Sequence, residues 1–344
     1  MKKKIFISVI LVLIGAAAFL GWKLFASSVS TASGKFFYIK TGSSYAEVKN
    51  ELVSKKYIKS GQWFDLASKI LRFKKVKPGR YKISSGMSVW KLVRMLRAGN
   101  QSQVSFVITK LRTKEDFARK VGKSFETDSL TMIQFLNNAD TLKDYGLDTN
   151  TVTAVLLPLT YTLNWNSTAE KIFKNCFTNY KKFWTKERIV KAKSLRLDRI
   201  EITTLASIVD EETLKKDDKT NIASVYLNRI RIGMPLQADP TVKFAIKDFA
   251  LKRITGTHLK TVSPYNTYMN RGLPPGPICT PSIETIDAVL NAPKTDYLYF
   301  VASSKFDGSS VFTTNLTDHS KYAKLYQQEL TRRMDSAKKA NQQN

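Results

Sequence analysis

Residues 201–216 read EITTLASIVDEETLKK and contain neither glycine nor proline, which favours a single helix. At about 100° per residue, one side of this helix carries an apolar stripe. The stripe is formed by Leu205, Ile208 and Val209. Glu212 falls on the centre of that stripe, whereas Asp210 and Glu211 point toward its flanks. The stretch therefore predicts a helix whose buried face carries one carboxylate.

A carboxylate on an apolar face is partly desolvated when the chain folds, which disfavours its charged form and raises its pKa. A raised pKa is what a general acid needs in order to work near neutral pH. Glu212 is therefore the candidate catalytic acid. The alternative is a structural role, in which Glu212 ends the helix in a salt bridge with an arginine such as Arg229 or Arg231.

Three polar segments with demanding backbone angles follow this helix. They are Leu236–Val242 (LQADPTV), Ser263–Tyr268 (SPYNTY) and Gly272–Ile278 (GLPPGPI). Amides and carboxylates bond sugar hydroxyls, and tyrosine rings cover sugar faces, so rigid loops carrying these groups suit a carbohydrate cleft. The residues concerned are Gln237, Asp239, Tyr265 and Asn266. The alternative is that the segments are structural turns.

Three lysines at residues 2–4 precede an uncharged apolar run from Ile5 to Trp22. At about 1.5 Å rise per residue, this run is just long enough for a hydrocarbon core of roughly 30 Å. The lysines place the N-terminus in the cytoplasm and the rest of the chain outside. We predict a cytoplasmic tail (1–4), a retained single-pass anchor in the inner membrane (5–25) and an extracytoplasmic remainder. A cleavable signal peptide is the alternative.

The chain of 344 residues carries 56 Lys+Arg against 28 Asp+Glu, a net charge of +28. Such a surplus attracts polyanions, which include nucleic acid, anionic membranes and acidic polymers. Because the bulk of the chain is expected outside the cytoplasm, nucleic acid is excluded as a partner. The apolar share of 43% is that of a globular protein, so a disordered chain is excluded as well.

A Ser/Ala/Thr/Gly-rich segment predicts a flexible linker at residues 26–35. The pattern of residues 36–100 then predicts strand, helix, helix and strand, which fits a small LysM-like module. This module is strongly basic, which indicates either a solvated face near an anionic membrane or glycan recognition. Residues 101–344 form a larger mixed catalytic domain, so the expected fold class is α+β.

Cysteine and histidine offer little chemistry in this sequence. Cys176 and Cys279 lie far apart without a framework of paired spacings, which favours two buried free thiols over a disulfide. His258 and His319 have no zinc-ligand spacing. We therefore predict neither a metal nor a cofactor.

Five motifs occur in an order that resembles the YceG-like family, the MltG-type endolytic murein transglycosylases. They are ASIVxxET at 206–213, LQxDPTV at 236–242, PYNTY at 264–268, GLPPGPI at 272–278 and FxxN at 312–315. The resemblance covers most of the chain. It implies a membrane-anchored enzyme that cuts nascent peptidoglycan strands internally and leaves a 1,6-anhydromuramyl end, and it places the catalytic acid at Glu212.

The resemblance also implies roles for other residues and partners. We expect five side chains to hold the glycan: Gln237, Asp239, Tyr265, Asn266 and Asn315. One acid suffices for a lytic transglycosylase, because the muramic acid 6-hydroxyl replaces water as the nucleophile. Peptidoglycan glycan strands are the expected substrate, and penicillin-binding synthases with the division or elongation machinery are the expected partners.

Two other functions remain open. The chain could be a non-catalytic glycan-binding scaffold of the cell-wall synthesis complex, in which Glu212 is structural. It could also be a hydrolytic muramidase, which would need a second carboxylate. Asp239 is the candidate for that second carboxylate.

Overall fold

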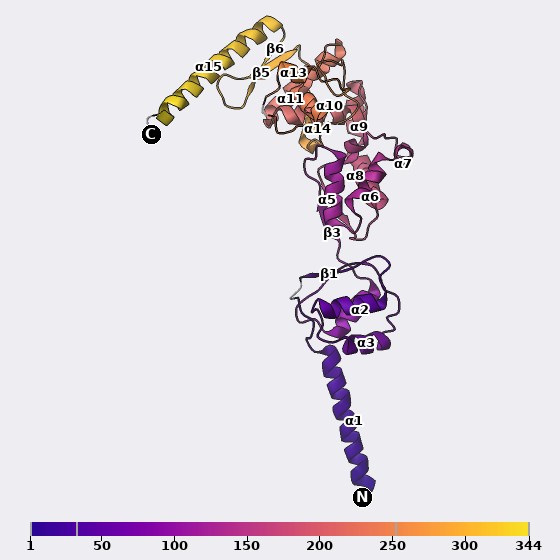
Figure 1. The fold of residues 1–344 in the computed structure, drawn as a ribbon. Helices are drawn as coiled ribbons and strands as arrows, with labels where there is room; N and C mark the ends of the chain where they lie inside the picture. The colour runs from indigo at the N-terminus through magenta and orange to yellow at the C-terminus, as the bar shows by residue number, and fades with distance from the viewer. Residues whose placement is uncertain (1, 32–33, 252, 343–344) are drawn as a thin grey trace. The chain divides into compact units, whose positions relative to one another are not determined.

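The computed structural model describes residues 2–31, 34–251 and 253–342. The remaining positions belong to the predicted tail, linker and catalytic domain, and those parts of the predictions lie outside the described residues. Helices dominate the described chain and are joined by small two-stranded sheets, β1 with β2, β3 with β4 and β5 with β6 (Figure 1). The expectation of a mixed helix and strand fold is confirmed.

The chain divides into two compact units, which are described separately below. The first contains Met1–Phe106, Val121–Asp128 and Tyr161–Ile172. The second contains Val107–Lys120, Ser129–Thr160 and Phe173–Asn344.

The N-terminal helix α1 (Lys2–Phe25) has the length and composition of a membrane-crossing helix. Its most apolar window has a mean hydropathy of 2.6, and none of that window is buried inside the protein. A core helix of a soluble domain would hide such a surface. The predicted anchor therefore has the required length and apolar surface.

Residues 26–31 do not form the flexible linker that the sequence predicted. Val29 is only 4% exposed and donates its N–H to the carbonyl of Met87 at 2.9 Å. Ser30 donates its N–H to the carbonyl of Tyr57, also at 2.9 Å. The prediction is wrong here because one apolar residue in a Ser-rich segment is enough to fix the backbone when distant partners accept it.

The strand–helix–helix–strand order predicted for the small module is present. Its elements are β1 (Phe36–Ile39), α2 (Tyr45–Ser54), α3 (Gly61–Ile70), β2 (Gly79–Lys82) and, beyond them, α4 (Val89–Ala98). The strands pair antiparallel with Phe37 opposite Tyr81. Ser44 and Glu47 form a capping box at the start of α2, as their spacing indicates. The likeness to LysM modules stays a prediction.

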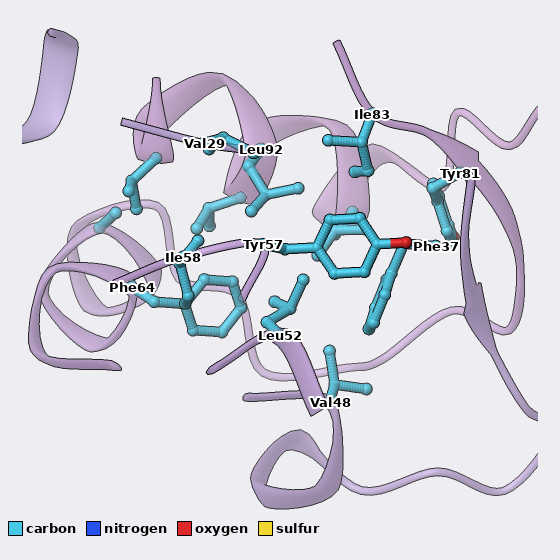
Figure 2. Packing of buried hydrophobic residues seen from close by; sticks show 14 of the residues in the cluster. Val29, Phe37, Val48, Leu52, Tyr57, Ile58, Phe64, Tyr81, Ile83 and Leu92 are labelled. Atoms are coloured by element: carbon cyan, nitrogen blue, oxygen red, sulfur yellow. The ribbon is translucent and has the colours of Figure 1, made fainter. Parts of the chain in front are cut away.

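The core of this module is built from aromatic and aliphatic side chains of both strands and all three helices (Figure 2). The rings of Phe37 and Tyr57 meet edge to face with centroids 5.3 Å apart. The Tyr57 hydroxyl donates to the carbonyl of Phe36 at 2.8 Å, so its polar end is satisfied. Each fully buried large apolar side chain contributes about 1.5–3 kcal/mol, which explains how so small a unit holds together.

The rest of the chain is mostly helical. Its elements are β3 (Val104–Val107), α5 (Lys114–Ser124), α6 (Ser129–Asn137), α7 (Ala139–Lys143), the 3-10 helix η1 (Val152–Val155), β4 (Thr160–Leu163), α8 (Ala169–Phe183), α9 (Lys186–Ser194), α10 (Arg199–Glu212), α11 (Lys216–Arg231), α12 (Asp239–Ile246), α13 (Gly256–Leu259), α14 (Ile283–Leu290), β5 (Tyr299–Ala302), β6 (Ser310–Thr313) and α15 (Leu316–Gln342). Cys176 and Cys279 are buried free thiols, as predicted.

Helix α10 lies at the centre of the second unit and packs against α9, α11, α12 and α14. Every residue from Ile202 to Asp210 is buried, so the helix is covered on all sides. The prediction of one apolar stripe is wrong in this respect. The predicted single helix over 201–216 is also wrong, since Thr213 is extended (φ −148°, ψ 144°) and ends α10 before α11 begins.

Candidate active site

Glu212 is the last residue of α10, and its side chain is partly buried. The hydroxyl of Tyr226 donates a hydrogen bond to Glu212 Oε1 at 2.8 Å. Tyr226 lies on α11, is 1% exposed, and reaches Glu212 because α10 and α11 pack against each other. The end of α10 therefore presents one carboxyl group in a fixed orientation.

Burial raises the pKa of Glu212 to about 7. The hydrogen bond from Tyr226 opposes this rise, and the negative charge of Asp239 adds to it. A carboxyl group with this pKa is partly protonated at neutral pH, so it can donate a proton and afterwards accept one.

The structural alternative for Glu212 was a salt bridge with Arg229 or Arg231. The Arg229 guanidinium instead donates to the backbone carbonyls of Leu298 and Leu236, each at 2.7 Å. Arg231 donates to Asn228 Oδ1 at 3.4 Å. Among the ion pairs of the described residues, none includes Glu212. The carboxyl group is thus free of the partner that would keep it ionised.

The two preceding acids have different surroundings. Asp210 is 6% exposed and pairs with Lys110 at 2.7 Å and with Lys219 at 3.3 Å. Burial alone would raise the pKa of Asp210, but hydrogen bonds from Lys110 and Thr285 and the two lysine charges hold it below its usual value. Glu211 pairs with Lys110 at 3.0 Å and with an arginine on the same segment. Asp210 and Glu211 are therefore ionised structural acids.

Asp239 opens α12 close enough to Glu212 to influence its pKa. The hydroxyl of Tyr268 donates to Asp239 Oδ1 at 2.6 Å. Burial raises the pKa of the Tyr268 hydroxyl far above its usual range, and the charges of Asp239 and Glu212 act in the same direction. Two carboxyl–tyrosine pairs, Glu212 with Tyr226 and Asp239 with Tyr268, therefore share one electrostatic neighbourhood.

Gln237 and Tyr265 come from two loops that the structure ties together. Gln237 is exposed, has a left-handed backbone (φ 52°) and donates its N–H to the carbonyl of Thr267 at 3.1 Å. The ring of Tyr265 packs on Phe244 of α12 with centroids 4.6 Å apart. Since Asp239 is on the same helix, the predicted residues Gln237, Asp239 and Tyr265 gather around α12.

Asn266 lies inside its loop and is 0% exposed. Its Nδ2 donates to the carbonyls of Leu259 and Thr261 at 2.9 and 2.8 Å, and its Oδ1 accepts from the N–H of Tyr268 at 3.0 Å. All these bonds stay within the loop. The geometry favours a positioning role for Asn266 over direct contact with a glycan.

Asn315 is exposed at the start of α15. Its Oδ1 accepts from the N–H of Asp318 at 2.9 Å, and its Nδ2 donates to Asp318 Oδ2 at 2.8 Å. These are the bonds of a helix cap. The contacts given for the described residues do not link Asn315 to Glu212, so its binding role stays a prediction.

The Pro-rich loop at 272–278 is held against α10 and against the segment around Asn150. Ile278 donates its N–H to Ser207 Oγ on α10 at 3.0 Å. A Cβ atom added to Gly276 would lie 2.2 Å from the backbone oxygen of Asn150. Only glycine allows this close approach, which explains its presence in so rigid a loop.

Two tyrosines of the site were not singled out from the sequence. Tyr268 lies in the predicted segment 263–268, so its residue type and place could have identified it. Tyr226 lies on the buried face of α11 and looks like an ordinary core residue in the sequence. Within the described ranges, no group of three or more His, Cys, Asp or Glu residues is placed to hold a metal ion.

Comparison with known proteins connects this site to a family. The YceG-like family matches residues 37–325. A Bacillus subtilis (strain 168) protein named endolytic murein transglycosylase is 30% identical, over 84% of this chain and 83% of its own length. A protein of the same name from Streptococcus pneumoniae serotype 2 is 27% identical, over 90% of this chain and 62% of its own length.

A solved structure agrees with these sequence matches. The crystal structure of a YceG-like protein from Listeria monocytogenes aligns with a TM-score of 0.55 at 28% identity. The alignment covers 83% of this chain and 98% of the Listeria chain. The family match spans well over half of the sequence and includes the helix that carries Glu212. This chain belongs to the YceG-like family.

Proposed function

We propose that this protein is a membrane-anchored lytic murein transglycosylase that cuts peptidoglycan glycan strands internally. The name shared by the Bacillus and Streptococcus relatives supports the activity and the substrate. The observation that carries the proposal is the raised pKa of Glu212, a partly buried carboxyl group held by Tyr226 without an ion-pair partner among the described residues. α1 would cross the inner membrane once, with its N-terminus in the cytoplasm and the site outside.

The proposed reaction needs only this one acid. Protonated Glu212 gives its proton to the glycosidic oxygen between MurNAc and GlcNAc, and the bond from the anomeric carbon to that oxygen breaks. The 6-hydroxyl of the same muramic acid attacks the anomeric carbon, and the Glu212 carboxylate takes the hydroxyl proton. Intramolecular attack benefits from proximity and replaces water. The products are a GlcNAc with a free hydroxyl and a 1,6-anhydroMurNAc end, and Glu212 is protonated again.

The other residues of the site would bind or position. Tyr226 holds the Glu212 carboxyl group, and Tyr268 holds Asp239. We assign Gln237 and Tyr265 to glycan contact because both reach the surface beside α12. Cleavage of nascent strands would make the enzyme a terminase of glycan elongation, working beside penicillin-binding synthases and the division or elongation machinery.

The products distinguish this function from its alternatives. The full chain, purified in detergent, is incubated with isolated peptidoglycan in water enriched in ¹⁸O, and the products are analysed by mass spectrometry. We expect anhydromuramyl ends without ¹⁸O. Reducing ends carrying ¹⁸O would indicate a muramidase in which Asp239 activates water. Binding without any product would indicate a glycan-binding scaffold.

The pH dependence should report Glu212 directly. We expect kcat/KM to fall as pH rises through about 7, because Glu212 must be protonated to act as an acid. Tyr226→Phe removes a hydrogen bond that stabilises the carboxylate, so the pKa of Glu212 should rise and the falling limb should move to higher pH. The measurement is the pH–rate profile of both proteins.

A matched control for Tyr226→Phe is Tyr322→Phe, which removes a hydroxyl from an exposed position on α15. Its limb should coincide with that of the unmodified enzyme. A Tyr226→Phe limb that stays in place or moves to lower pH would contradict the assignment of Glu212 as the titrating acid.

A further inference from the structure

The last turns of α1 pack on the small module through aromatic rings. Phe19 meets Trp63 of α3 edge to face with centroids 6.1 Å apart, and Phe25 meets Trp90 of α4 at 5.0 Å. Lys23 Nζ lies 4.7 Å from the centre of the Trp22 ring. The membrane helix and the module are thus in direct contact, and α3 lies next to the end of α1 (Figure 1).

The length of the apolar run fixes the depth of this contact. Ile5 to Trp22 spans about 27 Å as a helix, which only just crosses a hydrocarbon core of roughly 30 Å. Phe19 therefore lies inside the apolar layer or at its edge, because withdrawing it would leave the run too short. Trp63 touches Phe19 and must lie at nearly the same depth. Tryptophan is enriched at this boundary.

The face of α3 that includes Trp63 continues as an apolar stripe. Leu66 and Ile70 follow at helical spacing of three and seven residues. Ile70 is 53% exposed, although Phe64 and Ala67 on the other side of the same helix are completely buried in the module core. This stripe has no cover within the module, and it begins at the residue that contacts the membrane helix.

Basic side chains surround this stripe. Those exposed are Lys59 before α3 and Lys69, Arg72, Lys74 and Lys75 at or after its end. The acid within α3 is Asp65, which is paired with Lys49 at 3.0 Å. An apolar stripe with exposed cations at both ends matches the boundary of a bilayer that contains anionic lipids.

We infer that α3 is a second membrane contact, lying along the headgroup layer with Trp63, Leu66 and Ile70 toward the acyl chains and its basic neighbours on anionic headgroups. The inference rests on α1 spanning the membrane, as proposed above. It goes further, because a spanning helix alone would leave the module free to swing in the water. With α3 embedded, the module is held flat against the membrane surface.

Site-specific quenching tests this arrangement in the full chain. Ile70→Cys, Leu13→Cys and Lys40→Cys are labelled with an environment-sensitive fluorophore and reconstituted into phosphatidylglycerol–phosphatidylcholine vesicles containing spin-labelled lipid. Leu13 reports on α1, and Lys40 is an exposed residue directly after β1. The unmodified chain gives the labelling background, since Cys176 and Cys279 are buried. We expect strong quenching at 70 and 13 and several-fold weaker quenching at 40.

Two further results separate the causes. The pair Lys69→Glu and Arg72→Glu should weaken quenching at position 70, whereas the same charge change at the exposed Lys171 and Lys174 of α8 should not. Quenching at 13 without quenching at 70 would overturn the inference and leave the anchor intact, whereas no quenching at either position would overturn both. Protection of position 70 by added peptidoglycan, without lipid quenching, would assign this surface to glycan and overturn the inference.

Discussion

Replacing Glu212 by Gln is expected to reduce glycan cleavage by roughly 10²–10⁴-fold, the range for loss of a general acid. Gln has the size of Glu, and its amide oxygen can still accept the hydrogen bond from the Tyr226 hydroxyl. The fold and the glycan affinity should therefore be preserved. What is lost is the proton that the leaving oxygen needs. The measurement is the rate at which anhydromuramyl products form, together with binding of glycan by the inactive variant.

The control for this experiment is Glu211→Gln, the neighbouring acid on the same helix. Glu211 pairs with Lys110 and Arg112 at 3.0 and 3.1 Å, so it is ionised and unsuited to donate a proton. This variant should keep most of its activity. If Glu211→Gln were inactive while Glu212→Gln still cleaved glycan, Glu211 and not Glu212 would be the acid.

Helical spacing identified Glu212 from the sequence, but for an incomplete reason. The argument placed Glu212 on a single apolar stripe, whereas α10 is buried on every side and Asp210 is more deeply buried than Glu212. What distinguishes the acids is the position of the cations. Lys110 precedes Asp210 by a hundred residues in the chain and meets it only in the folded protein. Such a long-range pair leaves no local pattern to detect.

The same distinction separates the predicted from the unpredicted features elsewhere. The strand–helix–helix–strand module follows from local signals such as the capping box of Ser44 and Glu47. The docking of Val29 could not be predicted, because its partner Met87 is far away in the sequence. Residue type indicated that Asn266 would form hydrogen bonds. It could not show that the acceptors would be backbone carbonyls of its own loop.

Removing the carboxylate of Asp210 should destabilise the protein strongly. Asp210 is 6% exposed and is surrounded by Lys110, Lys219 and two hydroxyl donors, Ser282 and Thr285. Lys219 is itself only 7% exposed, so Asp210→Ala leaves an unpaired cation in the interior. Breaking a buried ion pair from one side costs about 3–5 kcal/mol. We expect a lower denaturation midpoint for the second unit, followed by circular dichroism in urea.

The pH dependence of stability gives this prediction a second readout. Because the pKa of Asp210 is held below its usual value of about 4, its stabilising effect is complete above that pH and is lost as pH falls through the lowered pKa. Asp210→Ala should therefore show a smaller loss of stability on acidification than the unmodified protein. Asp140→Ala, which removes a surface pair with Lys143, is the control and should change neither readout. An Asp210→Ala midpoint equal to that of the control would show that the buried network does not stabilise α10, and the contrast drawn here between Asp210 and Glu212 would lose its basis.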